Sequence, residues 1–297
     1  MGRGMIKNIV QKGSYTSPLY IYNRTQSKTE SFVNSLDSGK TQVAPSITSC
    51  VDNADIVFLC VADDASVEET IAEALKSNAA KGTLIVDCST IHPDTTNRVQ
   101  QTVEKAGAHF VACPVFGAPA MAESGSLITV LAGPKDQVER VRPFCKGVTA
   151  RAEVNYSDQE AGAATKLKIV GNTFIQHMVE CLSEGHVLAE KTGLGVDNLH
   201  AFVEQMFPGP YTAYSNRLRS GDYYQRDYPA FTAKLARKDY RHAKDLADRA
   251  GVQVKGLDVA GKHLQDVIDY ADDKGDIAGI YGAVRREAGL DFENQKK

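Results

Sequence analysis

The pattern of apolar residues along this chain changes near residue 158. Before that point, short apolar runs alternate with segments of helical periodicity, and the runs Asp55–Val61 and Thr83–Asp87 are continuous enough to be strands buried on both faces of a parallel sheet. After it, the apolar patterns are helical. The alternation predicts a doubly wound α/β sheet, and the second part predicts an all-α region. We therefore expect two domains, residues 1–158 and 159–297.

The expected elements follow the spacing of the apolar residues. Strands are expected at residues 18–22, 55–61, 83–87, 109–112 and 126–132. Helices are expected at residues 1–13, 27–36, 45–53, 65–75, 93–106, from 134 onward, and at 169–191, 196–206, 231–250, 258–271 and 277–287. The helix at 169–191 is apolar around much of its circumference. Such a helix usually needs a partner, so we expect a homodimer.

Composition narrows the class of function. Of the 297 residues, 42% are hydrophobic and 24% are charged, which is typical of a soluble globular protein. The net charge of -3 gives no reason to expect a nucleic acid or an anionic membrane as a partner. The six cysteines show no CxxC spacing and lie mostly in apolar runs, which favours a reducing compartment. We expect a cytoplasmic protein with a small-molecule substrate, without a metal site and without a signal peptide.

A lysine stands in the first turn of the long apolar helix. Burial of Lys168 disfavours its charged form and lowers its pKa toward the range in which an amine can exchange protons. Asn172 lies four residues later and shares its helix face. An amine beside an amide that can hold an oxygen suits general acid/base chemistry. The alternative is a lysine whose amine reaches solvent next to an ordinary polar contact.

Five separate motifs resemble those of the β-hydroxyacid dehydrogenases, the family of 3-hydroxyisobutyrate dehydrogenase and glyoxylate/succinic semialdehyde reductase. They are Met1-Gly2-x-x-Met5-x-x-Asn8, Asp87-Cys88-Ser89-Thr90-x-x-Pro93, Pro114-Val115-Phe116-Gly117-Ala118-Pro119, Lys168-x-x-x-Asn172 and Phe231…Lys238-Asp239. In this resemblance Gly2 is the third glycine of a dinucleotide-binding turn, and the first strand and first two glycines are lacking. A truncated gene model is the simplest explanation.

The resemblance implies a Rossmann-type domain, a helical second domain and a set of site residues. It implies Lys168 and Asn172 as catalytic residues, with the lysine exchanging a proton with a hydroxyl or carbonyl oxygen that the asparagine holds. It implies cofactor contacts from Gly2, Asn23, Arg24, Thr25, Cys60, Val61, Thr90 and Lys238. It implies substrate contacts from Ser89, Phe116, Gly117, Ala118, Phe231 and Asp239. Because Phe116 replaces the usual serine, the substrate is expected to be larger or less polar than a short hydroxyacid.

The segment after the strand at 18–22 bears on the cofactor. NAD enzymes place an acid there for the ribose 2′-hydroxyl, whereas an arginine accommodates a 2′-phosphate. The segment here is Asn23-Arg24-Thr25, so NADP is expected rather than NAD. Two alternatives to a hydroxyacid or aldehyde oxidoreductase stay open. One is a non-catalytic, dimeric family member, and the other is an imine reductase.

Overall fold

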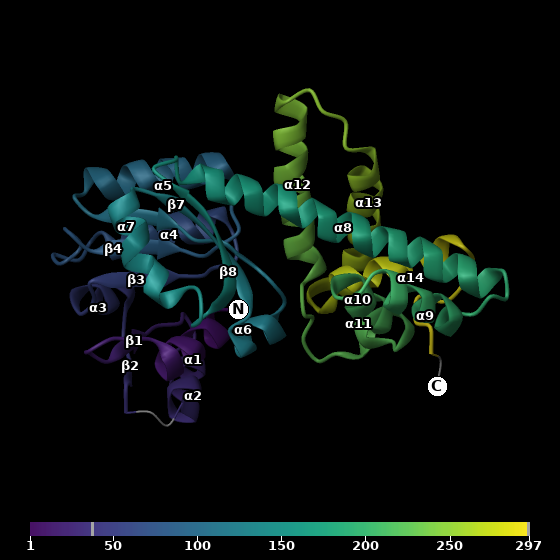
Figure 1. Ribbon diagram of the computed structural model, residues 1–297, viewed down its shortest axis with the longest axis horizontal. Coiled ribbons are helices and arrows are strands. Elements are labelled where there is room, and N and C mark those ends of the chain that lie inside the picture. Colours follow the sequence, from purple (N-terminus) through teal and green to yellow (C-terminus); the bar gives the residue numbers. More distant parts are fainter. Residues whose placement is uncertain (37–38, 296–297) are drawn as a thin grey trace. The chain divides into compact units, whose positions relative to one another are not determined.

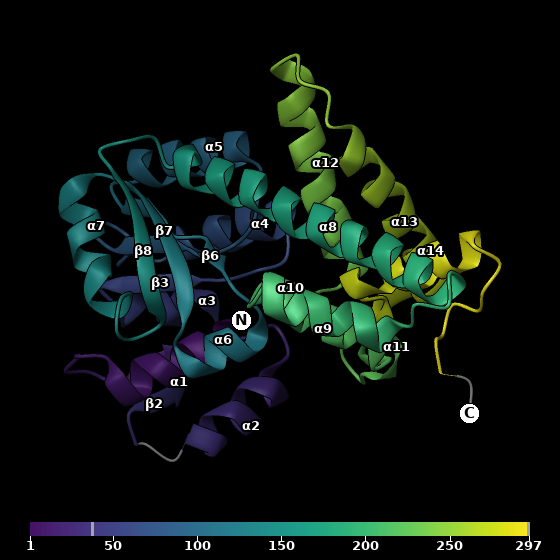
Figure 2. The same cartoon turned by 45° about the vertical axis from the view of Figure 1, so that its right-hand side comes forward.

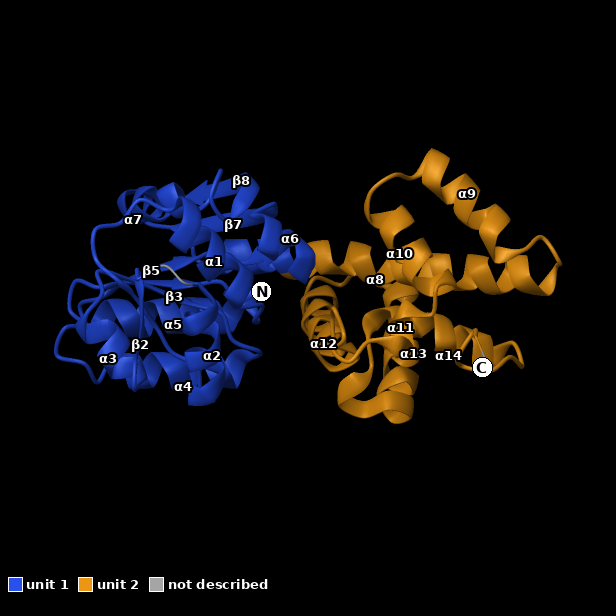
Figure 3. Cartoon of the chain, turned by 90° about the horizontal axis from the view of Figure 1, so that it is seen from below, with its two compact units in different colours: residues 1–168 blue, residues 169–297 orange. Residues whose placement is uncertain are grey.

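The computed structural model describes residues 1–36 and 39–295, and the chain divides into two compact units (Figures 1 and 3). Unit 1 comprises Met1–Lys168 and unit 2 comprises Ile169–Lys297. The division falls within one continuous helix, α8 (Gly162–Lys191). The functional domain limits expected from the sequence, residues 1–158 and 159–297, stay a prediction.

Unit 1 begins with a helix and a small parallel sheet. Its first elements are α1 (Gly2–Lys12), β1 (Leu19–Ile21), α2 (Gln26–Leu36), β2 (Thr41–Val43) and α3 (Ile47–Asp52). Leu19 of β1 lies opposite Thr41 of β2 in a two-stranded parallel pair. The strand β2 was not expected from the sequence, because three residues with only one apolar member, Val43, give too short a pattern.

A six-stranded sheet forms the rest of unit 1. Its strands are β3 (Ile56–Leu59), β4 (Leu84–Asp87), β5 (His109–Ala112), β6 (Val115–Phe116), β7 (Leu127–Gly133) and β8 (Ala150–Ser157). The remaining helices of the unit are α4 (Asp64–Ala74), α5 (Pro93–Lys105), α6 (Pro119–Ser124), α7 (Lys135–Val141) and the 3-10 turn η1 (Arg142–Phe144). Successive residues of β4 enter different core clusters, Leu84 and Val86 one and Ile85 the other, because side chains alternate across a strand.

The sheet of unit 1 is interrupted at the place of a missing strand. A doubly wound sheet has the strand order 3-2-1-4-5-6, so its first strand lies between the second and the fourth. Among the described residues, β2–β1 and β3–β4–β5 form parallel sets that correspond to 3-2 and 4-5-6, and no pairing joins β1 to β3. The expected Rossmann-type fold with its first strand lacking is therefore confirmed.

Within the described residues 169–295, the named elements of unit 2 are all helices. After α8 it contains α9 (Val196–Met206), α10 (Pro210–Arg219), α11 (Asp222–Gln225), α12 (Ala233–Arg249), α13 (Lys255–Ala271), η2 (Asp272–Lys274), η3 (Ile277–Gly279) and α14 (Ile280–Glu287). Its core includes Leu218, Leu264 and Tyr281, all fully buried. The long helices α12 and α13 were expected, and the shorter α10 and α11 were not.

Two further observations concern the character of the helices and the state of the cysteines. Within the described residues, no helix combines the length and the apolar character that crossing a membrane requires. All six cysteines are free thiols. Cys88, Cys113 and Cys145 are core residues as expected, whereas Cys60 and Cys181 are exposed, so those two do not serve as core packing.

Candidate active site

A buried asparagine joins α1, the first helix of unit 1, to α6. The helix α6 follows residues 114–118, which we call the glycine loop. Asn8 is 1% exposed, and its side-chain amide donates to the carbonyl oxygens of Gly4 at 2.9 Å and Ala122 at 2.8 Å. A Cβ atom on Gly4 would lie 2.7 Å from the backbone carbon of Ala122, so only glycine allows α1 and α6 to approach this closely. The two helices lie side by side in Figures 1 and 2. Sequence reasoning matched Asn8 to a family motif but did not find this contact.

The start of α1 lies beside the end of β3. A Cβ atom on Gly2 would lie 3.8 Å from the Cβ of Cys60. The first turn of α1 carries no acidic side chain, and the first N–H groups of any helix lack partners within it. Such a helix start binds phosphate groups well, so these residues fit one part of a pyridine dinucleotide.

The ends of β3 and β4 are held together by a serine. The Ser89 hydroxyl oxygen accepts a hydrogen bond from the backbone N–H of Val61 at 2.9 Å, and the Ser89 N–H donates to Asp87 Oδ1 at 2.8 Å. Ser89 is 1% exposed. The structure thus gives Ser89 a contact within the protein, and its role toward the substrate stays a prediction. Thr90 follows it, between β4 and α5.

The segment after β1 is an exposed turn. The side-chain oxygen of Asn23 accepts a hydrogen bond from the Thr25 N–H at 2.9 Å, which fixes the turn before α2. Arg24 between them is exposed. It is therefore accessible to a ligand at the carboxyl end of β1, the edge at which doubly wound sheets bind ligands.

The glycine loop places an aromatic ring on the candidate catalytic lysine. Phe116 ends β6, where it pairs with Ile128 of β7. Gly117 has a φ of 139°, and a Cβ atom there would lie 2.7 Å from the Leu127 side chain. Ala118 then caps α6. The Lys168 Nζ lies 4.4 Å from the centroid of the Phe116 ring. Two residues that were predicted separately, for catalysis and for substrate binding, are in contact.

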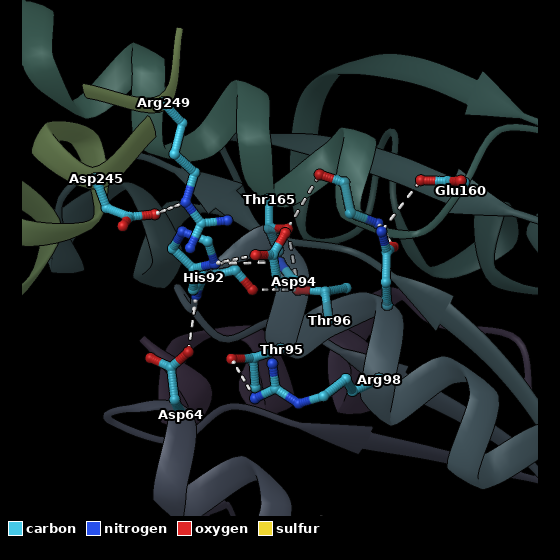
Figure 4. A network of polar contacts seen from close by, with 12 residues as sticks. Asp64, His92, Asp94, Thr95, Thr96, Arg98, Glu160, Thr165, Asp245 and Arg249 are labelled. Carbon is cyan, nitrogen blue, oxygen red and sulfur yellow. Dashed lines mark hydrogen bonds and ion pairs between the residues drawn. The ribbon is translucent and has the colours of Figure 1, made fainter. Parts of the chain in front are cut away.

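The first turn of α8 is anchored by α5, as Figure 4 shows for Thr96 and Thr165. Their hydroxyl oxygens lie 2.9 Å apart, and the Gly162 N–H donates to the Asn97 side-chain oxygen at 2.7 Å. A Cβ atom on Gly162 would lie 2.7 Å from that oxygen. These contacts fix the start of α8 and therefore the direction from which Lys168 reaches Phe116. None of them was predicted from the sequence.

The lysine and the asparagine of the predicted pair are both buried. Lys168 is 8% exposed and Asn172, one helical turn later on α8, is 5% exposed. In unit 2, the Asn172 side-chain amide donates to Asp239 Oδ2 at 2.6 Å, and Lys238 Nζ lies 3.3 Å from Asp239 Oδ1. Asp239 is 2% exposed. The structure therefore brings together three residues predicted separately, Asn172, Lys238 and Asp239.

The same face of α8 carries further buried polar side chains. Gln176 is 1% exposed and donates to the backbone oxygen of Ala236 at 3.1 Å, and Glu180 accepts from His263 Nδ1 at 2.8 Å. Both continue the four-residue spacing of the predicted pair, so the sequence held a signal for them that was not used. Phe231, by contrast, packs at the margin of the main core of unit 2.

The chain is similar in sequence to known oxidoreductases. Residues 1–157 match the family model described as the NAD binding domain of 6-phosphogluconate dehydrogenase. The chain is 35% identical over 293 residues to the NADH-dependent oxidoreductase ucdB of Aspergillus ustus, with 98% of each chain covered.

Solved structures share the fold. The 3-hydroxyisobutyrate dehydrogenase of Mycobacterium tuberculosis with L-serine gives a TM-score of 0.77 at 20% identity, and Psf3 in complex with NADP+ and 2-OPP gives 0.81 at 19% identity, each with 96% of both chains covered. Imine reductases also have this fold. The family match over more than half of the chain, together with the identity to a relative of the same length, shows that the chain belongs to the β-hydroxyacid dehydrogenase family of pyridine-nucleotide-binding oxidoreductases.

Proposed function

We propose that this chain catalyses hydride transfer between a nicotinamide nucleotide and a small hydroxyl or carbonyl compound, with Lys168 as general acid/base. The observation that carries the proposal is the burial of Lys168, a residue 8% exposed, on the helix face that also holds Asn172. When bound, the nucleotide supplies or accepts the hydride. Lys168 would donate a proton to the carbonyl oxygen in reduction and take it from the hydroxyl in oxidation. Asn172 would hold that oxygen, and Asp239 would orient the Asn172 amide.

A matched pair of lysine variants tests the role of the amine. Lys166 stands on the first turns of the same helix but is exposed, so Lys166→Ala removes a charge without touching the buried face. Lys168→Ala is expected to lower turnover by about 100- to 10,000-fold, the usual contribution of general acid/base catalysis, while nucleotide affinity is kept. Lys166→Ala should keep normal turnover. Near-normal turnover in Lys168→Ala would remove this residue from the mechanism.

The choice of nucleotide is a separate proposal. Arg24, exposed after β1 and without an acidic neighbour in the turn, supports NADPH, because an arginine suits a 2′-phosphate. The name of the Aspergillus ustus relative, NADH-dependent oxidoreductase, argues for NADH in that protein. Fluorescence titrations with NADPH and with NADH test this proposal by comparing the two affinities. We expect tighter binding of NADPH, and Arg24→Ala should weaken it by about tenfold while leaving NADH unchanged. Tighter binding of NADH by the unaltered chain would overturn the NADPH proposal.

Two other functions have specific observations in their favour. Imine reductases share the fold, and turnover of 2-methyl-1-pyrroline with no turnover of any carbonyl compound would favour that reaction. The other candidate is a family member without catalysis, which the separation of β1 from β3 among the described residues favours. A titration that detects no nucleotide binding would favour this second function.

We also propose a homodimer formed through α8. An exposed stripe runs along this helix through Val170, Phe174, Cys181 and Leu188, and Phe174 is 72% exposed. Two antiparallel copies that pack this stripe together would bury its apolar side chains, with Val170 of one copy opposite Leu188 of the other. Light scattering after size exclusion should show a dimer, and Phe174→Glu should give a monomer. Tyr228→Glu, at another exposed aromatic side chain, should stay dimeric. A monomeric unaltered chain would refute this proposal.

A further inference from the structure

The contact between Phe116 and Lys168 affects the charge of the amine. The Lys168 Nζ lies 4.4 Å from the ring centroid, within the range of a cation–π interaction. The face of an aromatic ring is electrostatically negative, so it stabilises an ammonium relative to a neutral amine. This effect opposes burial, which favours the neutral amine. The ring therefore favours the protonated state, the form of Lys168 that can donate a proton.

The ring is held in place by the backbone on both sides. Phe116 pairs with Ile128 in the sheet, and its side chain packs against the core cluster beneath that sheet. Gly117, with its φ of 139°, makes the turn that follows, and Leu127 fills the space where a side chain on Gly117 would stand. The position of the ring over the amine is thus part of the fold.

The same side chain also limits the substrate. A phenyl group offers no hydrogen-bond donor to a carboxylate, and the next two residues, Gly117 and Ala118, add no polar side chain. The side chains of residues 116–118 therefore favour an apolar group beside the reacting carbonyl over an anionic one.

We infer that Phe116 holds Lys168 as a cationic proton donor and directs the site toward the reduction of uncharged carbonyl compounds rather than carboxylate-bearing ones. The inference rests on the proposed function. In the reaction, the carbonyl carbon gains the hydride that a bound dihydronicotinamide supplies, the carbonyl oxygen gains the Lys168 proton, and an alcohol forms beside the oxidised nucleotide. The amine then regains its proton from water.

The first test probes the contact between Phe116 and Lys168 without measuring turnover. The pH dependence of Lys168 acetylation by acetic anhydride, followed by mass spectrometry, reports the midpoint between ammonium and amine. In Phe116→Leu, which removes the ring but keeps an apolar side chain, we expect the midpoint to fall by roughly one pH unit. Phe116→Tyr should keep the midpoint of the unaltered chain, and Lys166 serves as an internal control. An unchanged midpoint in folded Phe116→Leu would overturn the inference, and Phe116→Met replaces that variant if circular dichroism shows it unfolded.

The second test uses a matched pair of substrates, methyl benzoylformate and its free acid benzoylformate. We expect the ester to be reduced with a kcat/KM at least about tenfold higher than the acid, and Phe116→Ser to narrow or reverse that ratio. Equal or preferred reduction of the acid by the unaltered chain, or turnover of neither compound, would overturn the substrate assignment. A further outcome is that the acetylation midpoint falls in Phe116→Leu as expected while Lys168→Ala keeps its turnover. That result would overturn the proposed function but not the contact between Phe116 and Lys168.

Discussion

Removal of the Asn172 side chain should destabilise unit 2 by an amount that follows from its contact with Asp239. The Asn172 amide donates to a carboxylate oxygen at 2.6 Å, and the carboxylate is 2% exposed. Hydrogen bonds to charged groups contribute about 1.5–3 kcal/mol, and an unsatisfied buried acceptor adds to the loss. Alanine in place of asparagine in a helix returns roughly 0.5 kcal/mol. We therefore expect Asn172→Ala to lower the free energy of unfolding by about 2 kcal/mol.

A double-mutant cycle isolates this contact. Urea unfolding followed by circular dichroism on Asn172→Ala, Asp239→Ala and the double variant should give a coupling energy of roughly 1.5–2.5 kcal/mol. Asp248→Ala is the control on the same helix as Asp239, because its exposed pair with Lys244 should contribute less than about 0.5 kcal/mol. If the two single effects add to within about 0.5 kcal/mol, the contact does not organise the site as described.

Three further predictions concern packing and pH. Gly4→Ala should lower stability by about 1–3 kcal/mol in thermal or urea unfolding, because a Cβ atom there would lie 2.7 Å from Ala122, and unchanged stability would refute the close approach of α1 and α6. Burial, with His200 nearby, lowers the pKa of His186 from 6.5 to about 4. The unfolded state then binds more protons between these values, so stability should fall by up to about 3 kcal/mol as pH falls from 6.5 to 4, and urea unfolding of His186→Gln should lack this dependence. The hydrogen bond to Glu180 raises the pKa of His263, so its contribution should be present below pH 6.5 and be lost as pH rises through the raised value, and a flat profile there would contradict the pairing.

Buried parallel strands were the part of the fold that the sequence indicated best. The runs at 55–61 and 83–87 are apolar on both faces because the sheet is covered on both sides, and they contain β3 and β4. By contrast, β8 was missed because Arg151, Glu153 and Asn155 point toward partly exposed surroundings and break the apolar run. The helix α8 begins seven residues before the apolar pattern does, since its first turn is held by Asn97 rather than by periodicity.

The candidate site was predictable where it depends on helix spacing and unpredictable where it depends on tertiary contacts. The four-residue spacing of Lys168 and Asn172 was enough to place both on one buried face. The contact of Lys168 with Phe116 depends on the pairing of β6 with β7, and the contact of Asn172 with Asp239 depends on the packing of α12 against α8. Neither leaves a local pattern in the sequence.

In the proposed reaction, the amine of Lys168 moves the proton that accompanies hydride transfer. Chemical rescue tests it most directly. Lys168→Ala should be nearly inactive in single-turnover reduction, and added ethylamine should restore the rate in a saturable way that depends on the pKa of the amine used. Asn172→Ala, which keeps the lysine, should not respond to ethylamine. Full activity of Lys168→Ala without any added amine would contradict the claim.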